Sequence, residues 1–153
     1  MQEGLSEMEK IDLQAAFEPI HGDIEFIRIF MRFEYAVKKK YGTKKWTDLH
    51  KDLGQRFFEL VVQKGLAKTI ISHPPHKETY PDRVLTWVPS NRPKNTTNLL
   101  DLVNNVRNNL FHGGKSGHPD DDRNAQLISE SIMVLLEALA QDEELRLHFE
   151  RKD

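Results

Sequence analysis

The chain has 153 residues, the length of one domain, and a hydrophobic content of 38%, which is sufficient for a single core. Its formal net charge of −2 gives no global sign of a nucleic-acid-binding protein, so any RNA contact has to come from a local basic patch. The absence of cysteine excludes disulfides, cysteine zinc sites and a cysteine nucleophile. Because the sequence shows neither a signal peptide nor an apolar run of transmembrane length, we expect one soluble, cytoplasmic domain without membrane contact over residues 1–153.

The N-terminal third is predicted to be helical. A short leading helix is expected after the capping-box pattern Ser6-Glu7-Met8-Glu9 and before Pro19. A longer helix over residues 23–40, with Asp23 as its N-cap, has two apolar faces. The first face consists of Phe26, Ile29, Phe30, Phe33 and Val37, and the second of Ile24, Ile27, Met31 and Tyr35. Such a helix needs cover on both sides, so it lies at the centre of a bundle or at a subunit interface.

The next helix, over residues 47–64, carries its apolar residues on one side and therefore packs one-sidedly. Five prolines then exclude a long helix between residues 65 and 95, and a short extended piece is expected at residues 83–88. A connection this long is often functional.

The same connection has a local basic excess. Six lysines and arginines lie between residues 64 and 94, against only Glu78 and Asp82. We therefore expect it to contact an RNA substrate, with Tyr80 or Trp87 stacking on a base. The alternative is that Trp87 only fixes the loop to the core. The basic residues chosen as candidates for substrate binding are Lys77, Arg83, Arg92 and Lys94.

A third main helix follows, capped by Thr96 or Thr97 and ended by Gly113-Gly114. Its apolar stripe is formed by Leu99, Leu102, Val103, Val106 and Leu110. Arg107 and Asn108 lie outside this stripe near the C-terminal end, and His112 follows there. A polar loop over residues 116–122 precedes a last long helix that runs to about residue 140. A short charged helix is expected over residues 142–151.

Arg107 and His112 do not converge on an unbroken helix. At about 100° per residue they lie roughly 140° apart, whereas Asn108 and His112, four residues apart, are neighbours. Either the helix unwinds at His112, or a second copy of the chain supplies part of the site.

Arg107, the polar Asn108 directly after it, and His112 after four intervening residues resemble the arginine–histidine signature of the HEPN superfamily. This superfamily comprises helical bundles, many of them metal-independent ribonucleases that act as dimers with a composite site. The resemblance extends as architecture over about residues 23–140. It implies an all-α, four-helix up-and-down bundle with short extra helices at both ends, and a homodimer of the toxin or defence type with an antitoxin or defence-system protein as partner.

The resemblance also implies a chemistry without cofactor or metal. His112 acts as general base or acid, Arg107 stabilises the charge on the phosphate, and Asn108 is a polar residue that orients the base or a phosphate. The 2′-hydroxyl of RNA attacks the adjacent phosphate and leaves a cyclic phosphate end, so DNA is not cleaved. Lys115 joins the residues expected to bind the substrate.

The same residues and their neighbours suggest four other interpretations. Gly113-Gly114-Lys115-Ser116 is not a phosphate-binding loop, because Asn109 occupies the position of the first required glycine and a helix, not a strand, precedes it. Loop histidines at positions 73, 76, 112 and 118 with Asp120 to Asp122 offer metal hydrolysis as a minor alternative. Arg107 pairing with a carboxylate and His112 capping the helix end are the structural alternative. The second functional candidate is a catalytically silent HEPN-like dimer that binds RNA or nucleotides or acts as a scaffold.

Overall fold

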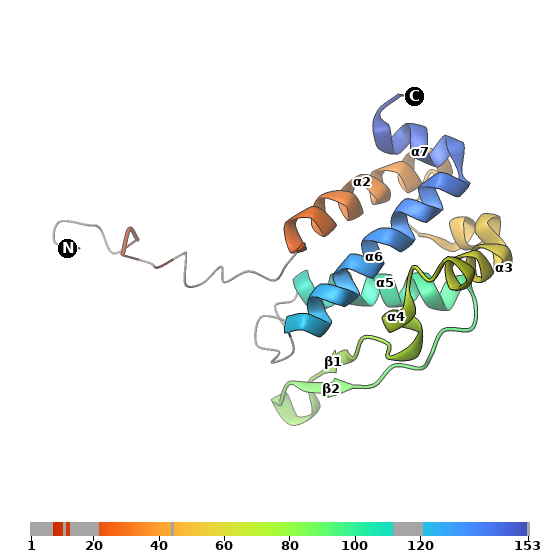
Figure 1. The fold of residues 1–153 in the computed structure, drawn as a ribbon. Coiled ribbons are helices and arrows are strands. Elements are labelled where there is room, and N and C mark those ends of the chain that lie inside the picture. The colour runs from red at the N-terminus through yellow and green to blue at the C-terminus, as the bar shows by residue number, and fades with distance from the viewer. Residues whose placement is uncertain (1–7, 11, 13–21, 44, 112–120, 153) are drawn as a thin grey trace.

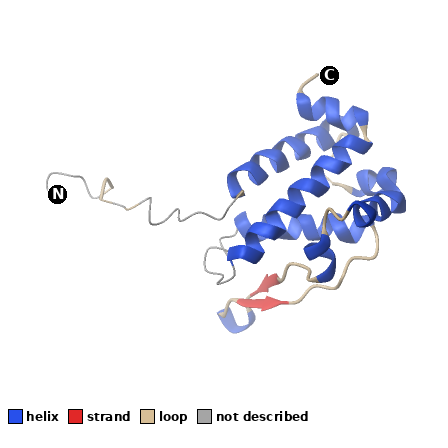
Figure 2. Ribbon diagram, viewed as in Figure 1, coloured by secondary structure: helices blue, strands red, loops and turns tan. Residues whose placement is uncertain are grey.

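The computed structural model describes residues 8–10, 12, 22–43, 45–111 and 121–152. The fold is mostly helical and belongs to the all-α class, as expected, with one short hairpin (Figures 1 and 2). No helix in the described part of the chain is long and apolar enough to cross a membrane. The expected leading helix falls largely outside the described residues. The helices are α2 (Asp23–Tyr41), α3 (Thr47–Lys64), α4 (Lys68–Ser72), α5 (Thr96–Phe111), α6 (Asp121–Gln141) and α7 (Glu143–Glu150).

Helix α2 buries the first of its two apolar faces. Trp46 closes this face, with its ring centroid 5.4 Å from that of Phe30 and 5.1 Å from that of Phe33. The second face is open among the described residues, where Ile24 is 63% and Met31 60% exposed. Within the described residues one side is covered, and cover of the other side at a subunit interface stays a prediction.

The start of α2 differs from the expectation. Gly22, with φ of 80°, takes the N-cap position instead of Asp23, which is the first helical residue. The Asp23 carboxylate accepts a hydrogen bond from the adjacent Ile24 N–H at 2.8 Å rather than from a residue further along the helix.

Helix α3 has an unexpected kink at Gly54, whose φ of 64° favours glycine. The Thr96 hydroxyl donates to the Gly54 carbonyl at 2.5 Å and accepts from the Phe58 N–H at 3.2 Å. Thr96 therefore connects α5 to the kink and does not cap α5. Asn95 caps that helix instead, because its Oδ1 accepts from the Asn98 N–H at 2.8 Å.

Helix α5 packs between α3 and α6. The predicted stripe is buried from Leu99 to Val106, whereas Leu110 is only partly buried. Asn109 does not belong to the stripe but is buried, and its amide donates to the His76 carbonyl at 2.9 Å. In α6 the Leu136 side chain is 40% exposed, whereas the other leucines, isoleucines and valine are buried: Leu127, Ile128, Ile132, Val134, Leu135 and Leu139.

The connection between α3 and α5 is folded. Strands β1 (Lys77–Thr79) and β2 (Thr86–Val88) pair antiparallel, with Glu78 opposite Trp87. The extended piece expected at 83–88 is thus confirmed in its second half, whereas β1 and α4 were not predicted. Two side chains of α6 hold the connection. Glu130 accepts from the Thr69 and Ile70 N–H groups, and Arg123 donates to the carbonyls of His73 and Pro74.

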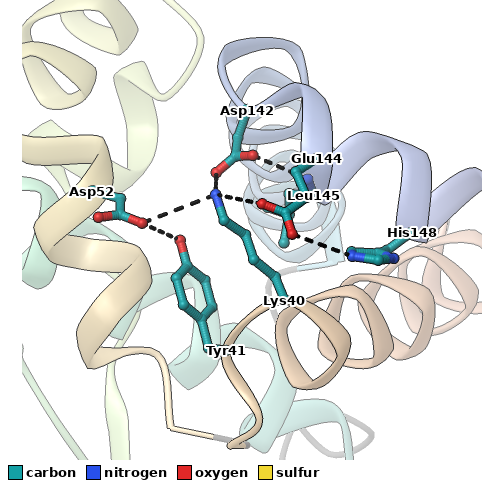
Figure 3. A network of polar contacts seen from close by, with 7 residues as sticks. All are labelled: Lys40, Tyr41, Asp52, Asp142, Glu144, Leu145 and His148. Carbon is teal, nitrogen blue, oxygen red and sulfur yellow. Dashed lines mark hydrogen bonds and ion pairs between the residues drawn. The ribbon is translucent and has the colours of Figure 1, made fainter. Parts of the chain in front are cut away.

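A network of charges holds α2, α3 and α7 together (Figure 3). Lys40 Nζ lies 2.5 Å from Asp142 Oδ2 and 3.9 Å from carboxylate oxygens of Asp52 and Glu144. Asp142 also caps α7 through the Leu145 N–H at 3.0 Å. The Tyr41 hydroxyl donates to Asp52 at 2.7 Å. Burial, this hydrogen bond and the surrounding carboxylates raise the pKa of Tyr41, so its hydroxyl stays protonated at neutral pH.

Candidate active site

Arg107 and Asn108 lie side by side near the C-terminal end of α5. Arg107 Nη1 donates to Asn108 Oδ1 at 2.9 Å. The guanidinium carbon is 4.5 Å from the ring centroid of Phe111 and 5.5 Å from that of Phe30. Arg107 is half-buried, and its Nε is shielded from water without a hydrogen-bond partner among the described residues. The guanidinium is thus positioned by two aromatic rings and an amide.

The alternative in which Arg107 pairs with a carboxylate finds no support in the described part of the chain. None of the ion pairs there involves Arg107. A cation that is partly withdrawn from water and lacks a carboxylate partner keeps its charge available for an anionic ligand.

His112 and Lys115, the two remaining members of the predicted site that follow Arg107, lie outside the described residues. The described part of α5 ends at Phe111, directly before His112. The relative placement of Arg107 and His112 therefore stays a prediction.

A cleft of about 390 Å³ lies between β1 and α5 and includes Asn108. Its α5 wall is made of amides, because Asn105, Asn108 and Asn109 have the spacing that puts residues on one helix face. Its β1 wall brings Lys77 to the same place. The complete lining consists of Lys77, Glu78, Tyr80, Asn105, Asn108 and Asn109.

The other basic candidates lie elsewhere. Arg92 and Lys94 line a second cleft of about 730 Å³, together with Asn98 and Asp101 near the start of α5. Asp101 and Asn108 are seven residues apart, or about 10 Å along the helix. Arg83 lies in the hairpin turn with φ of 65°. Of the described basic candidates, the structure brings only Lys77 into a cleft with Asn108.

Glu78, Asn105 and Asn109 belong to the cleft but were not predicted as site residues. The shared face of the three asparagines on α5 is a signal that the sequence does contain. Glu78 offered no such signal, because its position depends on the pairing of β1 with β2. Its Oε2 is shielded from water and has no hydrogen-bond partner among the described residues. Desolvation, a hydrogen bond to Glu78 and the charge of that carboxylate raise the pKa of Tyr80.

The described residues contain no group of three or more histidines and carboxylates that could hold a metal ion. His73 Nδ1 lies 3.0 Å from the Ser72 hydroxyl, which is an ordinary surface contact. His118 and Asp120, which belong to the metal alternative, lie outside the described residues.

Comparison with known proteins gives no assignment. No family model matches the chain, and no curated protein and no solved structure matches it significantly.

Proposed function

We propose that this protein is a metal-independent endoribonuclease of the HEPN toxin or defence type, built on a four-helix up-and-down bundle. The observation that carries the proposal is the arrangement of Arg107. Its guanidinium is held by Asn108 and by the rings of Phe30 and Phe111, without a carboxylate among the described residues, and Asn108 itself lines a polar cleft. A fixed cation without an anionic partner suits the charge that gathers on a phosphate during cleavage.

The remaining roles follow from the chemistry of RNA cleavage. A group with a pKa near neutrality has to take the proton of the 2′-hydroxyl, and histidine is the side chain that meets this need without a metal. His112 follows α5 directly and is assigned this role. Asn108 already orients Arg107, and Lys77 in the cleft is assigned to a neighbouring phosphate.

The proposal includes a homodimer with a composite site. It is supported by the open apolar face of α2, on which Ile24, Met31 and Tyr35 are exposed among the described residues. Large apolar side chains exposed along one helix face are a feature of protein interfaces. Light scattering at micromolar concentration should give twice the mass of the chain, and Met31→Glu should give a monomer. A wild-type monomer that cleaves RNA at full rate would contradict the composite site.

The second candidate is a catalytically silent dimer that binds RNA or nucleotides or acts as a scaffold. It is favoured by the packing of Arg107 on Phe30, a fully buried core residue, because such packing also serves stability alone. An antitoxin or defence-system partner is compatible with both candidates.

One experiment separates the candidates. The purified protein is incubated with total RNA in excess chelator, beside His112→Ala. The ribonuclease produces fragments with cyclic phosphate ends, whereas His112→Ala is inactive and equally stable. Absence of cleavage by a folded dimer would favour the silent module. Activity that is lost in chelator and restored by zinc or manganese would favour metal hydrolysis.

A further inference from the structure

The cleft between β1 and α5 has the size and chemistry of a site for a small polar ring. Its volume of about 390 Å³ is at the small end of ligand sites, which span about 300–1,000 Å³. Amides of Asn105 and Asn108, a carboxylate, a lysine and a tyrosine surround it. A nucleobase presents hydrogen-bonding groups on its edges and a flat face for stacking, so it matches such a lining.

Glu78 limits which nucleobase fits. Its Oε2 is withdrawn from water and makes no hydrogen bond to any described residue, while the Tyr80 hydroxyl hydrogen-bonds to the same carboxylate and has to release it when a ligand binds. A polar atom in this state costs about 1–3 kcal/mol, and more when it is charged, until a donor reaches it. Because the last torsion angle of a glutamate side chain is broadly populated, the carboxylate can turn this oxygen toward the cleft. An ionised carboxylate only accepts hydrogen bonds, so the ligand has to supply donors.

The four RNA bases differ in the donors on their Watson–Crick edge. Guanine offers two adjacent donors, N1–H and the N2 amino group, which match the two oxygens of a carboxylate. Adenine and cytosine place one amino group next to an acceptor nitrogen, and uracil places one N–H between two carbonyls. Each of these three bases would bring at least one acceptor against the carboxylate. They should therefore bind less favourably than guanine by about 1–3 kcal/mol, the discrimination that a good bidentate contact provides.

We propose that this cleft binds a guanine base of single-stranded RNA, with Glu78 on its N1–H and N2 amino groups. Asn105 and Asn108 contact the remaining edge, and Tyr80, which is 59% exposed at the rim, stacks on the ring. Asn109 supports the cleft, because its amide is engaged with the His76 carbonyl that directly precedes β1.

Asn108 belongs both to the cleft and to the pair with Arg107. Asn108 is therefore the residue that connects a base in the cleft to the Arg107 guanidinium. The inference deepens the proposed ribonuclease by naming the base at which it cuts. The guanine site can be tested by binding alone, without cleavage of the RNA.

The test measures binding with pentanucleotides that cannot be cleaved. Fluorescently labelled 2′-fluoro RNAs of the form UUXUU, with each of the four bases at X, are titrated with the wild-type protein by anisotropy. We expect the guanine oligonucleotide to bind about ten-fold more tightly than the other three, which corresponds to about 1.4 kcal/mol. Glu78→Gln should reduce this preference to less than about two-fold.

The matched control is Glu143→Gln, which removes an exposed carboxylate on α7 and should retain the preference. Equal affinities for all four oligonucleotides, or a guanine preference that survives Glu78→Gln, would overturn the guanine site. A retained preference without any cleavage of natural RNA would instead contradict the ribonuclease alone, so the two failures are distinguishable.

Discussion

Two regions of the molecule withdraw charged groups from water, and they do so in opposite ways. At the junction of α2, α3 and α7, Lys40 faces three carboxylates, and Asp142 is bonded to both Lys40 and the Leu145 N–H. At the end of α5, the Arg107 Nε and the Glu78 Oε2 lack hydrogen-bond partners among the described residues. Unbonded buried polar groups are costly, so the first region is suited to stability and the second to a ligand.

The largest effect is expected from breaking the α5 site. His112→Ala and Arg107→Met should each lower RNA cleavage by about 100-fold or more. Methionine keeps the apolar contact with Phe30 and Phe111, so Arg107→Met removes the charge with little loss of packing. The double variant, measured in the same kinetic assay, should be barely slower than either single variant, because residues that act as one unit are not additive. Multiplicative losses would mean that the two residues act independently.

Arg107→Ala serves as a second comparison. Arg107 lies outside the apolar stripe, but because it contacts Phe30 its truncation should lower the stability of the fold. The alanine variant should lose about 1 kcal/mol of unfolding free energy relative to the methionine variant. Urea denaturation measures this difference.

The junction should respond in stability instead of activity. Lys40→Met leaves Asp142, whose side chain is only 11% exposed, without its cation, and should cost about 2 kcal/mol of unfolding free energy. For a chain of this length the melting temperature should fall by about 4–8 °C, while RNA cleavage by the folded protein is retained. Lys39→Met is the matched control, because Lys39 is exposed on the same helix and should change stability by less than about 0.5 kcal/mol. An equal loss in both variants would remove the special role of Lys40.

The sequence predicts contacts between neighbouring residues better than contacts between residues that lie far apart in the chain, and the two regions differ in this respect. The helices and the apolar stripe of α5 depend on spacing within one element, so periodicity predicts them well. The junction joins residues 102 positions apart, from Lys40 to Asp142, and no local pattern indicates that pairing. The cleft likewise depends on the hairpin, which places Glu78 and Lys77 against α5. The kink at Gly54 was missed because the apolar residues of α3 continue their spacing across it.

The basic candidates can be compared with one another, because Lys77 is the only one of the described ones that shares a cleft with Asn108. Lys77→Gln should weaken binding of non-cleavable RNA about three-fold to ten-fold and reduce the slope of log affinity against log salt by up to about one. Arg83→Gln, in the hairpin turn, should have a smaller effect. Equal salt slopes for the wild type and both variants would assign these residues to solvation only.

The smallest expected effect is on the pH dependence of the unfolding free energy. Burial lowers the pKa of His50, while the charge of Asp101 opposes the shift. The unfolded chain therefore takes up a proton at this residue as the pH falls below about 6.5, before the folded chain does, so acidification destabilises the fold. His50→Gln should flatten the decrease in unfolding free energy between pH 7 and 5.5, by at most about 1.4 kcal/mol per pH unit. Identical pH profiles in urea denaturation would contradict this assignment.

The most direct test of the central claim, that the end of α5 cleaves RNA through the 2′-hydroxyl without metal, uses chimeric oligonucleotides. A DNA strand with one riboguanosine is incubated with the protein in excess chelator, beside the same strand without the ribose 2′-hydroxyl. We predict a single cut directly after the riboguanosine that leaves a 2′,3′-cyclic phosphate, detected by mass spectrometry, and no cut in the all-DNA strand. Cleavage of the all-DNA strand, or a product with a 3′-hydroxyl end, would contradict the account.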